Sequence, residues 1–323
     1  MNIMRKIFFL VIEIFFSSQL FAQTEPEVVE VAHYKGGKTC AVSYTFDDGY
    51  VEQYTMAAPE LEKRGFRGTF YINGSNINRD LEHVTDTTRA TWGQLREMSE
   101  HGHEIANHGW AHRNFARFPL DSLKVDIQRD DEAILKYIGK PSKTFAYPNN
   151  NKSEPGKSYV EQGRVGTRLE QRSVGSKRSL QDLNHWVDGL IEKGEWGVGM
   201  THGLTYGYDA FVNPQRLWDH WDYVKQHADK VWVGTFEEVA SYVKERDAVR
   251  LKIERNRQTI VVTPTLNLDA ELFTEPLTMV VNEIGKGRVT ARQGKKKLAV
   301  EIRDGKALFD FNPYGGAVKI RIK

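Results

Sequence analysis

The stretch Ala41-Val42-Ser43-Tyr44-Thr45-Phe46-Asp47-Asp48-Gly49 closes an apolar run with two adjacent carboxylates and a glycine. The run predicts a strand, and side chains alternate faces along a strand, so Asp47 and Asp48 need not share one role. One of them can hold a metal ion while the other handles a proton. Asp-Gly pairs most often only turn the chain, so this stretch alone also fits a plain turn.

Short apolar segments alternate with helical segments from residue 38 to residue 248, a pattern that predicts an α/β architecture. The expected strands cover residues 40–46, 69–73, 103–106, 144–147, 164–167, 198–201 and 231–234. The expected helices cover residues 51–64, 92–100, 122–138, 180–193 and 214–228, and a last helix starts at Phe236 after a capping box of Thr235 and Glu238. Seven strands of this kind suggest a barrel.

The pattern changes after residue 248. Apolar residues then recur at every second position, as in residues 318–322, and Asp304-Gly305 predicts a hairpin turn. We therefore expect a small β-sandwich-like module over residues 249–323. All seven tryptophans lie before it, so the module lacks the commonest stacking platform for sugars. A structural or docking role is favoured over carbohydrate binding, with the first domain or a glycan as the surface on which it docks.

Residues 1–22 resemble a secretory signal peptide, because Arg5 and Lys6 precede an apolar stretch that ends at a small residue, Ala22. The stretch is too short to span a bilayer comfortably. We expect a secreted or periplasmic protein with no membrane span in the mature chain, and a linker over residues 23–37.

The charges of the 323-residue chain are balanced, with 45 Lys and Arg residues against 43 Asp and Glu residues and no long block of either sign. The electrostatic footprint of a nucleic-acid-binding protein is therefore absent. This balance favours a partner close to neutral.

Two histidines follow about 60 residues after the paired aspartates. His108 and His112 are four residues apart, a spacing that lets both imidazoles reach one cation from a helical turn or a tight loop. With Asp48 they make a plausible metal site that leaves room for a water molecule, as a hydrolytic site requires. The HExxH motif of zinc proteases is not formed, because His108 comes one residue too late after His103-Glu104.

Residues 45–49, TFDDG, and residues 102–112, GHEIANHGWAH, together resemble the motifs of the NodB-like polysaccharide deacetylases, a carbohydrate esterase family. The resemblance covers about residues 38–248. It implies a distorted (β/α) barrel with fewer than eight repeats, which agrees with the seven expected strands, and the β module would follow it.

The resemblance also implies roles for individual residues. By position in the motifs, Asp47 is the catalytic base, and Asp48, His108 and His112 hold a divalent metal. Zn²⁺ suits this ligand set best, and Co²⁺ or Ni²⁺ also suit it. The late family motif, an apolar strand that ends in the acid histidine, is matched by residues 198–202, so His202 is the expected acid.

Two family motifs are altered in this chain. Many members have an arginine followed by proline, an aromatic residue and glycine, but here the arginine position is Ala146. The family's Asp-x-x-Asp-Trp reads Asp182-Leu183-Asn184-His185-Trp186. In the family that arginine bridges the second aspartate and the base, so both ends of one ion pair are replaced together. We expect His185 to contact Asp47 directly; a surface or merely packed His185 is the alternative.

Residues beside these motifs are expected to contact the substrate. The candidates are Tyr147, Pro148, Trp186 and Met200, with Trp186 at the acetyl pocket because aromatic faces suit pyranose rings. The backbone N–H of Asn149 is expected to complete an oxyanion hole.

The function implied is metal-dependent removal of acetyl groups from a polysaccharide or oligosaccharide, foremost N-acetyl groups of N-acetylglucosamine-type sugars. An O-acetyl esterase acting on xylan or another decorated polysaccharide would need the same residues. The missing arginine also raises the possibility of a catalytically silent glycan-binding protein, but the retention of the ligand, base and acid positions argues against it.

Overall fold

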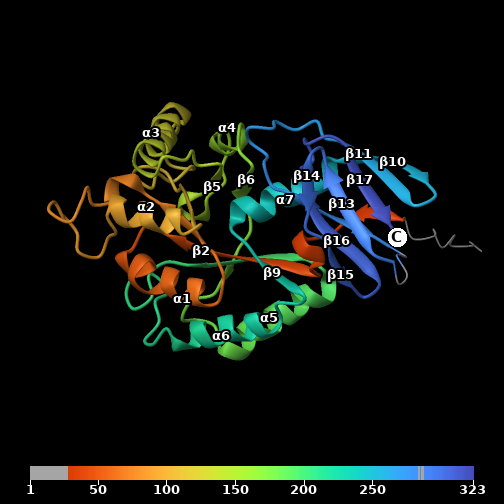
Figure 1. The fold of residues 1–323 in the computed structure, drawn as a ribbon. Helices are drawn as coiled ribbons and strands as arrows, with labels where there is room; N and C mark the ends of the chain where they lie inside the picture. The colour runs from red at the N-terminus through yellow and green to blue at the C-terminus, as the bar shows by residue number, and fades with distance from the viewer. Residues whose placement is uncertain (1–27, 283, 285–286) are drawn as a thin grey trace, which may run out of the picture.

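The computed structural model describes residues 28–282, 284 and 287–323. The expected signal peptide, residues 1–22, lies outside the described residues. Within the described part of the chain, no helix combines the length and apolar character that a membrane crossing requires. Figure 1 shows an α/β domain with a smaller β module at one end of it.

The α/β domain is built on a parallel sheet with the strand order β6-β5-β4-β3-β2-β8-β7, and β9 also pairs with β2. Its strands are β2 (Cys40–Asp47), β3 (Thr69–Ile72), β4 (Glu104–Asn107), β5 (Thr144–Ala146), β6 (Gly166–Arg168), β7 (Arg172–Ser173), β8 (Trp196–Thr201) and β9 (Val231–Val233). The two end strands of this order, β6 and β7, are not paired with each other, so the sheet forms an open half-barrel. The predicted α/β barrel-like fold is confirmed, and all seven predicted strands are present.

Strand β2 lies inside this sheet and has three partner strands. All eight of its residues are buried, and it pairs with β3, β8 and β9. A parallel strand covered on both faces needs apolar residues on both faces, which explains the continuous run of residues 40–46. Asp47, the last residue of the strand, is therefore held inside the barrel.

Helices surround the sheet on its outside (Figure 1). They are α1 (Ala58–Lys63), α2 (Trp92–Glu100), α3 (Leu120–Ile138), α4 (Gly156–Glu161), α5 (Leu180–Lys193), α6 (Gln215–Gln226) and α7 (Phe236–Ala248). A π-helical segment, Gln53–Ala57, leads into α1, and short 3₁₀ turns occupy Lys35–Gly37, Gly74–Asn76 and Pro148–Asn150. The predicted capping box of Thr235 and Glu238 starts α7, and α2 and α5 begin with capping boxes as well.

The C-terminal module consists of two antiparallel sheets, as predicted. One has the order β10-β11-β17-β13-β14 and the other β1-β12-β16-β15. The strands are β1 (Val29–Val31), β10 (Arg250–Asn256), β11 (Thr259–Thr265), β12 (Leu277–Val281), β13 (Val289–Gln293), β14 (Lys296–Leu298), β15 (Glu301–Arg303), β16 (Lys306–Phe311) and β17 (Val318–Ile322). The expected hairpin turn at Asp304-Gly305 joins β15 to β16, and both residues have positive φ.

Strand β1 corrects the expected linker over residues 23–37. Val29 is fully buried in the core of the module, and β1 pairs with β12, so the chain enters the module before it builds the α/β domain. A three-residue strand is too short to show a period-two pattern. Tyr242 of α7 also lies in this core and donates a hydrogen bond to the carbonyl oxygen of Ala32 at 2.8 Å.

We predict that Tyr242→Phe lowers the free energy of unfolding by about 1–2 kcal/mol, because it leaves the buried Ala32 carbonyl without this donor. Urea unfolding followed by fluorescence measures the change. Tyr137→Phe is the matched control, since Tyr137 stacks on Trp92 through its ring. Equal unfolding midpoints for both variants and the wild type would contradict the prediction.

Candidate metal centre and active site

A cavity of about 550 Å³ opens where the strands of the half-barrel end. Its lining residues lie at or shortly after the carboxyl ends of β2, β4, β5, β6 and β8, and they are Asp47, Asp48, His108, His112, Tyr147, Asn149, Asn150, Arg168, Gln171, Met200, His202 and Tyr208. The carboxyl ends of parallel strands meet at one edge of a sheet, where loops of distant sequence converge. This topology brings together the TFDDG stretch, the two histidines and His202.

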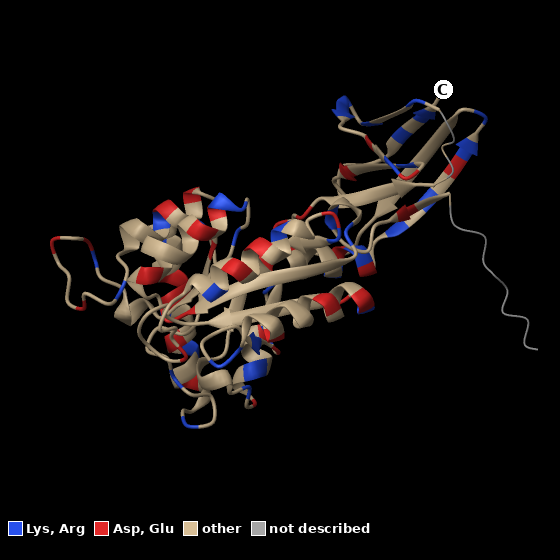
Figure 2. Cartoon of the chain, turned by 90° about the horizontal axis from the view of Figure 1, so that it is seen from below, with Lys and Arg blue, Asp and Glu red and all other residues tan. Residues whose placement is uncertain are grey.

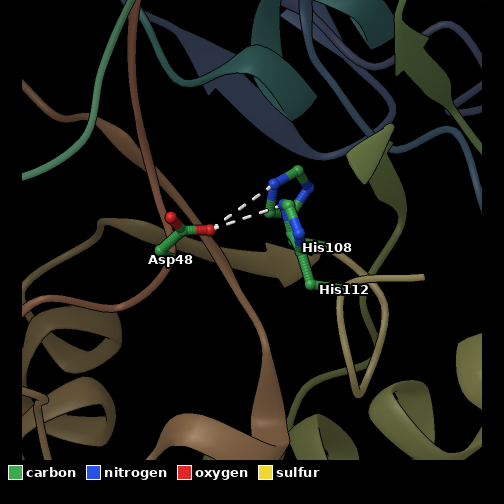
Figure 3. Close-up of side chains that lie close together, drawn as sticks. All are labelled: Asp48, His108 and His112. Atoms are coloured by element: carbon green, nitrogen blue, oxygen red, sulfur yellow. Dashed lines mark ion pairs between the residues drawn. The ribbon is translucent and has the colours of Figure 1, made fainter. Parts of the chain in front are cut away.

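Asp48, His108 and His112 form a compact group in this cavity (Figure 3). Their potential ligand atoms all lie within 4.8 Å of one another. Oδ1 of Asp48 is 3.7 Å from Nε2 of His108 and 3.8 Å from Nε2 of His112. Ligands about 2 Å from one cation are separated by roughly 3–4 Å, so the three side chains are arranged as ligands of a single ion.

Two of these three residues, Asp48 and His112, have a backbone with positive φ, which sets the direction of their side chains. Asp48 has a φ of 75° and His112 has a φ of 52°, values that residues other than glycine rarely adopt. The turn at Asp48 is held by its N–H, which donates to the carbonyl oxygen of Tyr71 at 2.9 Å, and by Arg89, which donates to the Asp48 carbonyl oxygen at 2.7 Å. Such conformations cost about 1–3 kcal/mol each and cluster at functional sites.

The tautomer of His108 is set by its surroundings. Its Nδ1 lies 2.7 Å from the carbonyl oxygen of Ala146, which can only accept, so Nδ1 carries the proton. Nε2, which faces Asp48, is then free to bind a cation. Burial is the main cause that lowers the pKa of His108, and the neutral imidazole is the form that binds metals.

The residues of this group fit a divalent cation. Oδ1 of Asp48 is buried and has no hydrogen-bond partner among the described residues. A buried carboxylate oxygen without a partner is costly, and a cation between Asp48 and the two histidines would satisfy it. Two imidazole nitrogens and one carboxylate suit Zn²⁺, Co²⁺ or Ni²⁺.

Asp47 forms a buried ion pair with Arg168, the last residue of β6. The guanidinium donates to both carboxylate oxygens, at 2.7 and 2.5 Å, and also to Oγ1 of Thr45 at 2.8 Å. Burial raises the pKa of the Asp47 carboxyl, but Arg168 and His108 outweigh this effect, and the pKa falls to about 2. Asp47 is therefore ionised at neutral pH.

The expected contact between His185 and Asp47 is wrong. His185 is exposed on α5, and Arg168 occupies the place beside Asp47. The sequence does not indicate Arg168, because the family motif places the arginine at position 146. Ala146 of β5 is the direct register partner of Arg168 on β6, so the arginine comes from one strand further along the sheet. An arginine directly after the predicted strand 164–167 was the available signal.

His202 lies at the end of β8 on another wall of the cavity. Its ring contacts Tyr208 edge-on, with centroids 5.3 Å apart, and its Nδ1 is buried without a hydrogen-bond partner in the described part of the chain. Gln53 donates to the backbone oxygens of Asp47 at 2.7 Å and His202 at 3.1 Å. This side chain, which the sequence did not single out, therefore ties the ends of β2 and β8 together.

Comparison with known proteins agrees with the family resemblance of the sequence motifs. The family described as Polysaccharide deacetylase matches residues 35–162. The chain contains a polysaccharide deacetylase domain. It is 28% identical to the peptidoglycan-N-acetylmuramic acid deacetylase PdaA of Bacillus subtilis over 183 residues, 56% of this chain and 59% of that protein.

The chain is also similar to a second curated protein and to a solved structure. A gellan lyase from a Bacillus species is 24% identical over 84% of this chain but only 13% of its own length. A solved Mycobacterium smegmatis protein assigned as a polysaccharide deacetylase has the same fold, with a TM-score of 0.51, 17% identity, and coverage of 70% of this chain and 98% of that one. The chain thus spans less than two thirds of these curated relatives.

Not all of the residues that were expected to contact the substrate line the cavity of the metal ligands. Tyr147, Asn149 and Met200 line the same cavity as the metal ligands. Trp186, expected at the acetyl pocket, lines a neighbouring cavity of about 570 Å³ instead, where it lies against Gly197 of β8. Pro148 is buried and is not among the residues that line the metal-site cavity.

Arg168→Met is predicted to lower the free energy of unfolding by roughly 3–5 kcal/mol, because it leaves the Asp47 carboxylate buried without its partner. Arg178→Met, at an exposed position, is the matched control. The double variant Arg168→Met/Asp47→Asn should lose less than the sum of the two single variants, as expected for coupled residues. An Arg168→Met variant as stable as the control would refute the ion pair's contribution.

We predict the opposite behaviour for Asp48→Asn in metal-free protein, namely no loss of stability, because an amide replaces a carboxylate whose buried Oδ1 has no hydrogen-bond partner among the described residues. The same variant should weaken Zn²⁺ binding by more than about 100-fold, since even outer-shell partners of metal ligands are worth 10- to 100-fold. Calorimetric titration with Zn²⁺ and urea unfolding in a chelator provide the two readouts. Unchanged Zn²⁺ affinity would show that the group is not a metal site.

Proposed function

We propose that this protein hydrolyses acetyl groups from a polysaccharide or oligosaccharide, most specifically N-acetyl groups of N-acetylglucosamine-type sugars. One observation carries the proposal: a single cavity holds a cation-binding group, Asp48, His108 and His112, next to an ionised carboxylate, Asp47, and a histidine, His202. The similarity to PdaA, a deacetylase of an N-acetylated sugar, supports the same chemistry.

Asp48, His108 and His112 would hold the divalent cation, with Zn²⁺ as the first candidate. When bound, such an ion lowers the pKa of water and polarises a carbonyl oxygen. His108 is prepared for this role by its hydrogen bond to Ala146, which leaves Nε2 unprotonated, and by its burial, which keeps the ring neutral.

Asp47 would act as the base that takes the proton of the attacking water. Its Oδ2 lies 3.8 Å from Nε2 of His108, so it borders the cation-binding group directly. A carboxylate offers about four lone-pair sites, and Arg168 uses one on each oxygen, so the others can accept a proton. Arg168 fixes the orientation of the carboxylate through its two hydrogen bonds, and it lowers the pKa of Asp47, so the carboxylate is ionised before the water is deprotonated.

His202 would supply the proton that the departing nitrogen requires. An amide nitrogen is a poor leaving group until it is protonated, and a histidine can donate at neutral pH. Its ring is held by the edge-on contact with Tyr208, and its backbone is linked to that of Asp47 through Gln53. The backbone N–H of Asn149 would stabilise the oxyanion, with Tyr147 and Met200 forming walls of the acetyl site.

Export of the protein fits this function, because peptidoglycan, the substrate named for PdaA, lies outside the cytoplasm. The signal-peptide pattern of residues 1–22 supports a secreted or periplasmic location. Detection of the processed chain in the periplasm or medium tests this part of the proposal.

The activity is tested by acetate release from N-acetylated chito-oligosaccharides, peptidoglycan and acetylated xylan, with and without added Zn²⁺, Co²⁺ or Ni²⁺. We expect release from the N-acetylated substrates, loss with a chelator, and a decrease in kcat of about 10²–10⁴ in Asp47→Asn and His202→Ala, the usual contribution of a general base or acid. His185→Gln is the control and should keep full activity, because His185 is exposed outside the cavity.

Other outcomes would contradict the proposal in distinct ways. Release from acetylated xylan alone would replace it by an O-acetyl esterase. Absence of release from every substrate by metal-loaded protein that binds these glycans would indicate a silent glycan-binding protein.

A further inference from the structure

The charges of the chain are distributed unevenly between its two parts. Residues 249–323 contain 15 of the 45 Lys and Arg residues but only 8 of the 43 Asp and Glu residues. The β module therefore carries a formal charge of +7, and the rest of the chain carries −5. Figure 2 shows Lys and Arg along the strands of the module. The near-neutral total, which suggested a neutral partner, conceals this separation.

Three of these cations form a row on the five-stranded sheet. Lys297 of β14 is the register partner of Arg292 on β13, and Arg292 is the register partner of Lys319 on β17. Arg321 follows two residues after Lys319 and so lies on the same face. All four side chains are exposed, whereas the alternate residues of these strands, such as Ile320, are buried in the core of the module.

This row is unfavourable for the sheet by itself. Neighbouring strands are about 4.8 Å apart, and like charges that lie directly opposite each other destabilise a strand pair. Among the described residues, none of these four cations forms an ion pair with a carboxylate of the chain. Glu254, further along the same cross-strand row, is engaged by Lys252 at 2.7 Å. An external anion would remove the repulsion.

We propose that this face, defined by Lys297, Arg292, Lys319 and Arg321, binds an acidic polysaccharide that carries a carboxylate on its sugar units. The spacing of adjacent strands is comparable to one sugar unit of an extended chain, so successive carboxylates can meet successive cations. The module contains no tryptophan, so the contact is electrostatic and not based on ring stacking. The choice of a glycan over other polyanions rests on the proposed function.

Such a face would hold the deacetylase domain on an acidic polymer while the separate catalytic cavity acts on acetylated sugars. The +7 module supplies the attraction, and the −5 remainder of the chain disfavours binding of the same polymer over the α/β domain. Binding and catalysis are then independent properties of the two parts.

Binding of the full-length protein to polygalacturonate, measured by biolayer interferometry at several salt concentrations, tests the proposal. The wild type should bind at low salt, and a neutral chito-oligosaccharide should not compete at this face. The variant Lys297→Gln/Arg292→Gln/Lys319→Gln should bind at least about tenfold more weakly and show a smaller salt dependence, as for other cation–polyanion contacts. The control Lys63→Gln/Lys136→Gln/Lys193→Gln removes three exposed cations from the α/β domain and should bind like the wild type.

Several results would overturn the proposal. These are no binding by the wild type, equal weakening in both triple variants, or tighter binding to single-stranded DNA or anionic vesicles than to polygalacturonate. The charge-conserving variant Lys297→Arg/Arg292→Lys/Lys319→Arg should retain binding, so a variant that merely misfolds is recognised by comparison with it. Binding measured on the Asp47→Asn background, without turnover, separates a failure of this proposal from a failure of the proposed function.

Discussion

The ion pair between Arg168 and Asp47 is the constraint on which the site depends. Arg168 ends β6 and Asp47 ends β2, and three strands separate β6 from β2 in the sheet. Their side chains can touch only if the sheet curls so that both point into its interior. Taking two charges out of water costs several kcal/mol per ion, and the bidentate contact, together with the hydrogen bond to Thr45, offsets that cost. The pair therefore links the curvature of the half-barrel to the ionisation of Asp47.

Next to this satisfied pair stands a group that the fold leaves unsatisfied. Asp48 has a buried oxygen without a partner among the described residues and a backbone in the left-handed region, and His112 and Asn149 share that backbone conformation. An unpartnered buried oxygen and a left-handed backbone both lower stability, and such features are expected at functional sites. Asp47 and Asp48 are adjacent in sequence, yet the charge of Asp47 is paired with Arg168, whereas Asp48 lies with two histidines in an arrangement that suits a cation.

The sequence predicted features that depend on local pattern or on a motif. The apolar run of β2, the seven main strands, the capping box of α7 and the placement of Asp48 with His108 and His112 are of this kind. Strand β1 escaped prediction because three residues show no period and its partner, β12, lies about 250 residues away. The contact of Arg168 escaped for a related reason, since it joins strands that are neighbours neither in sequence nor in the sheet.

The wrong prediction for His185 has its physical explanation in the register of two adjacent strands. Because two motif residues are replaced together, the sequence predicts the substitute partner of Asp47 at one of the replaced positions, His185. The structure supplies the partner from the strand next to Ala146 instead, directly across in register. Ala146 is fully buried and small, and so leaves space inside the barrel for the guanidinium of Arg168. Asp47 requires a bidentate cation beside its carboxylate, and here β6, the register neighbour of β5, supplies it.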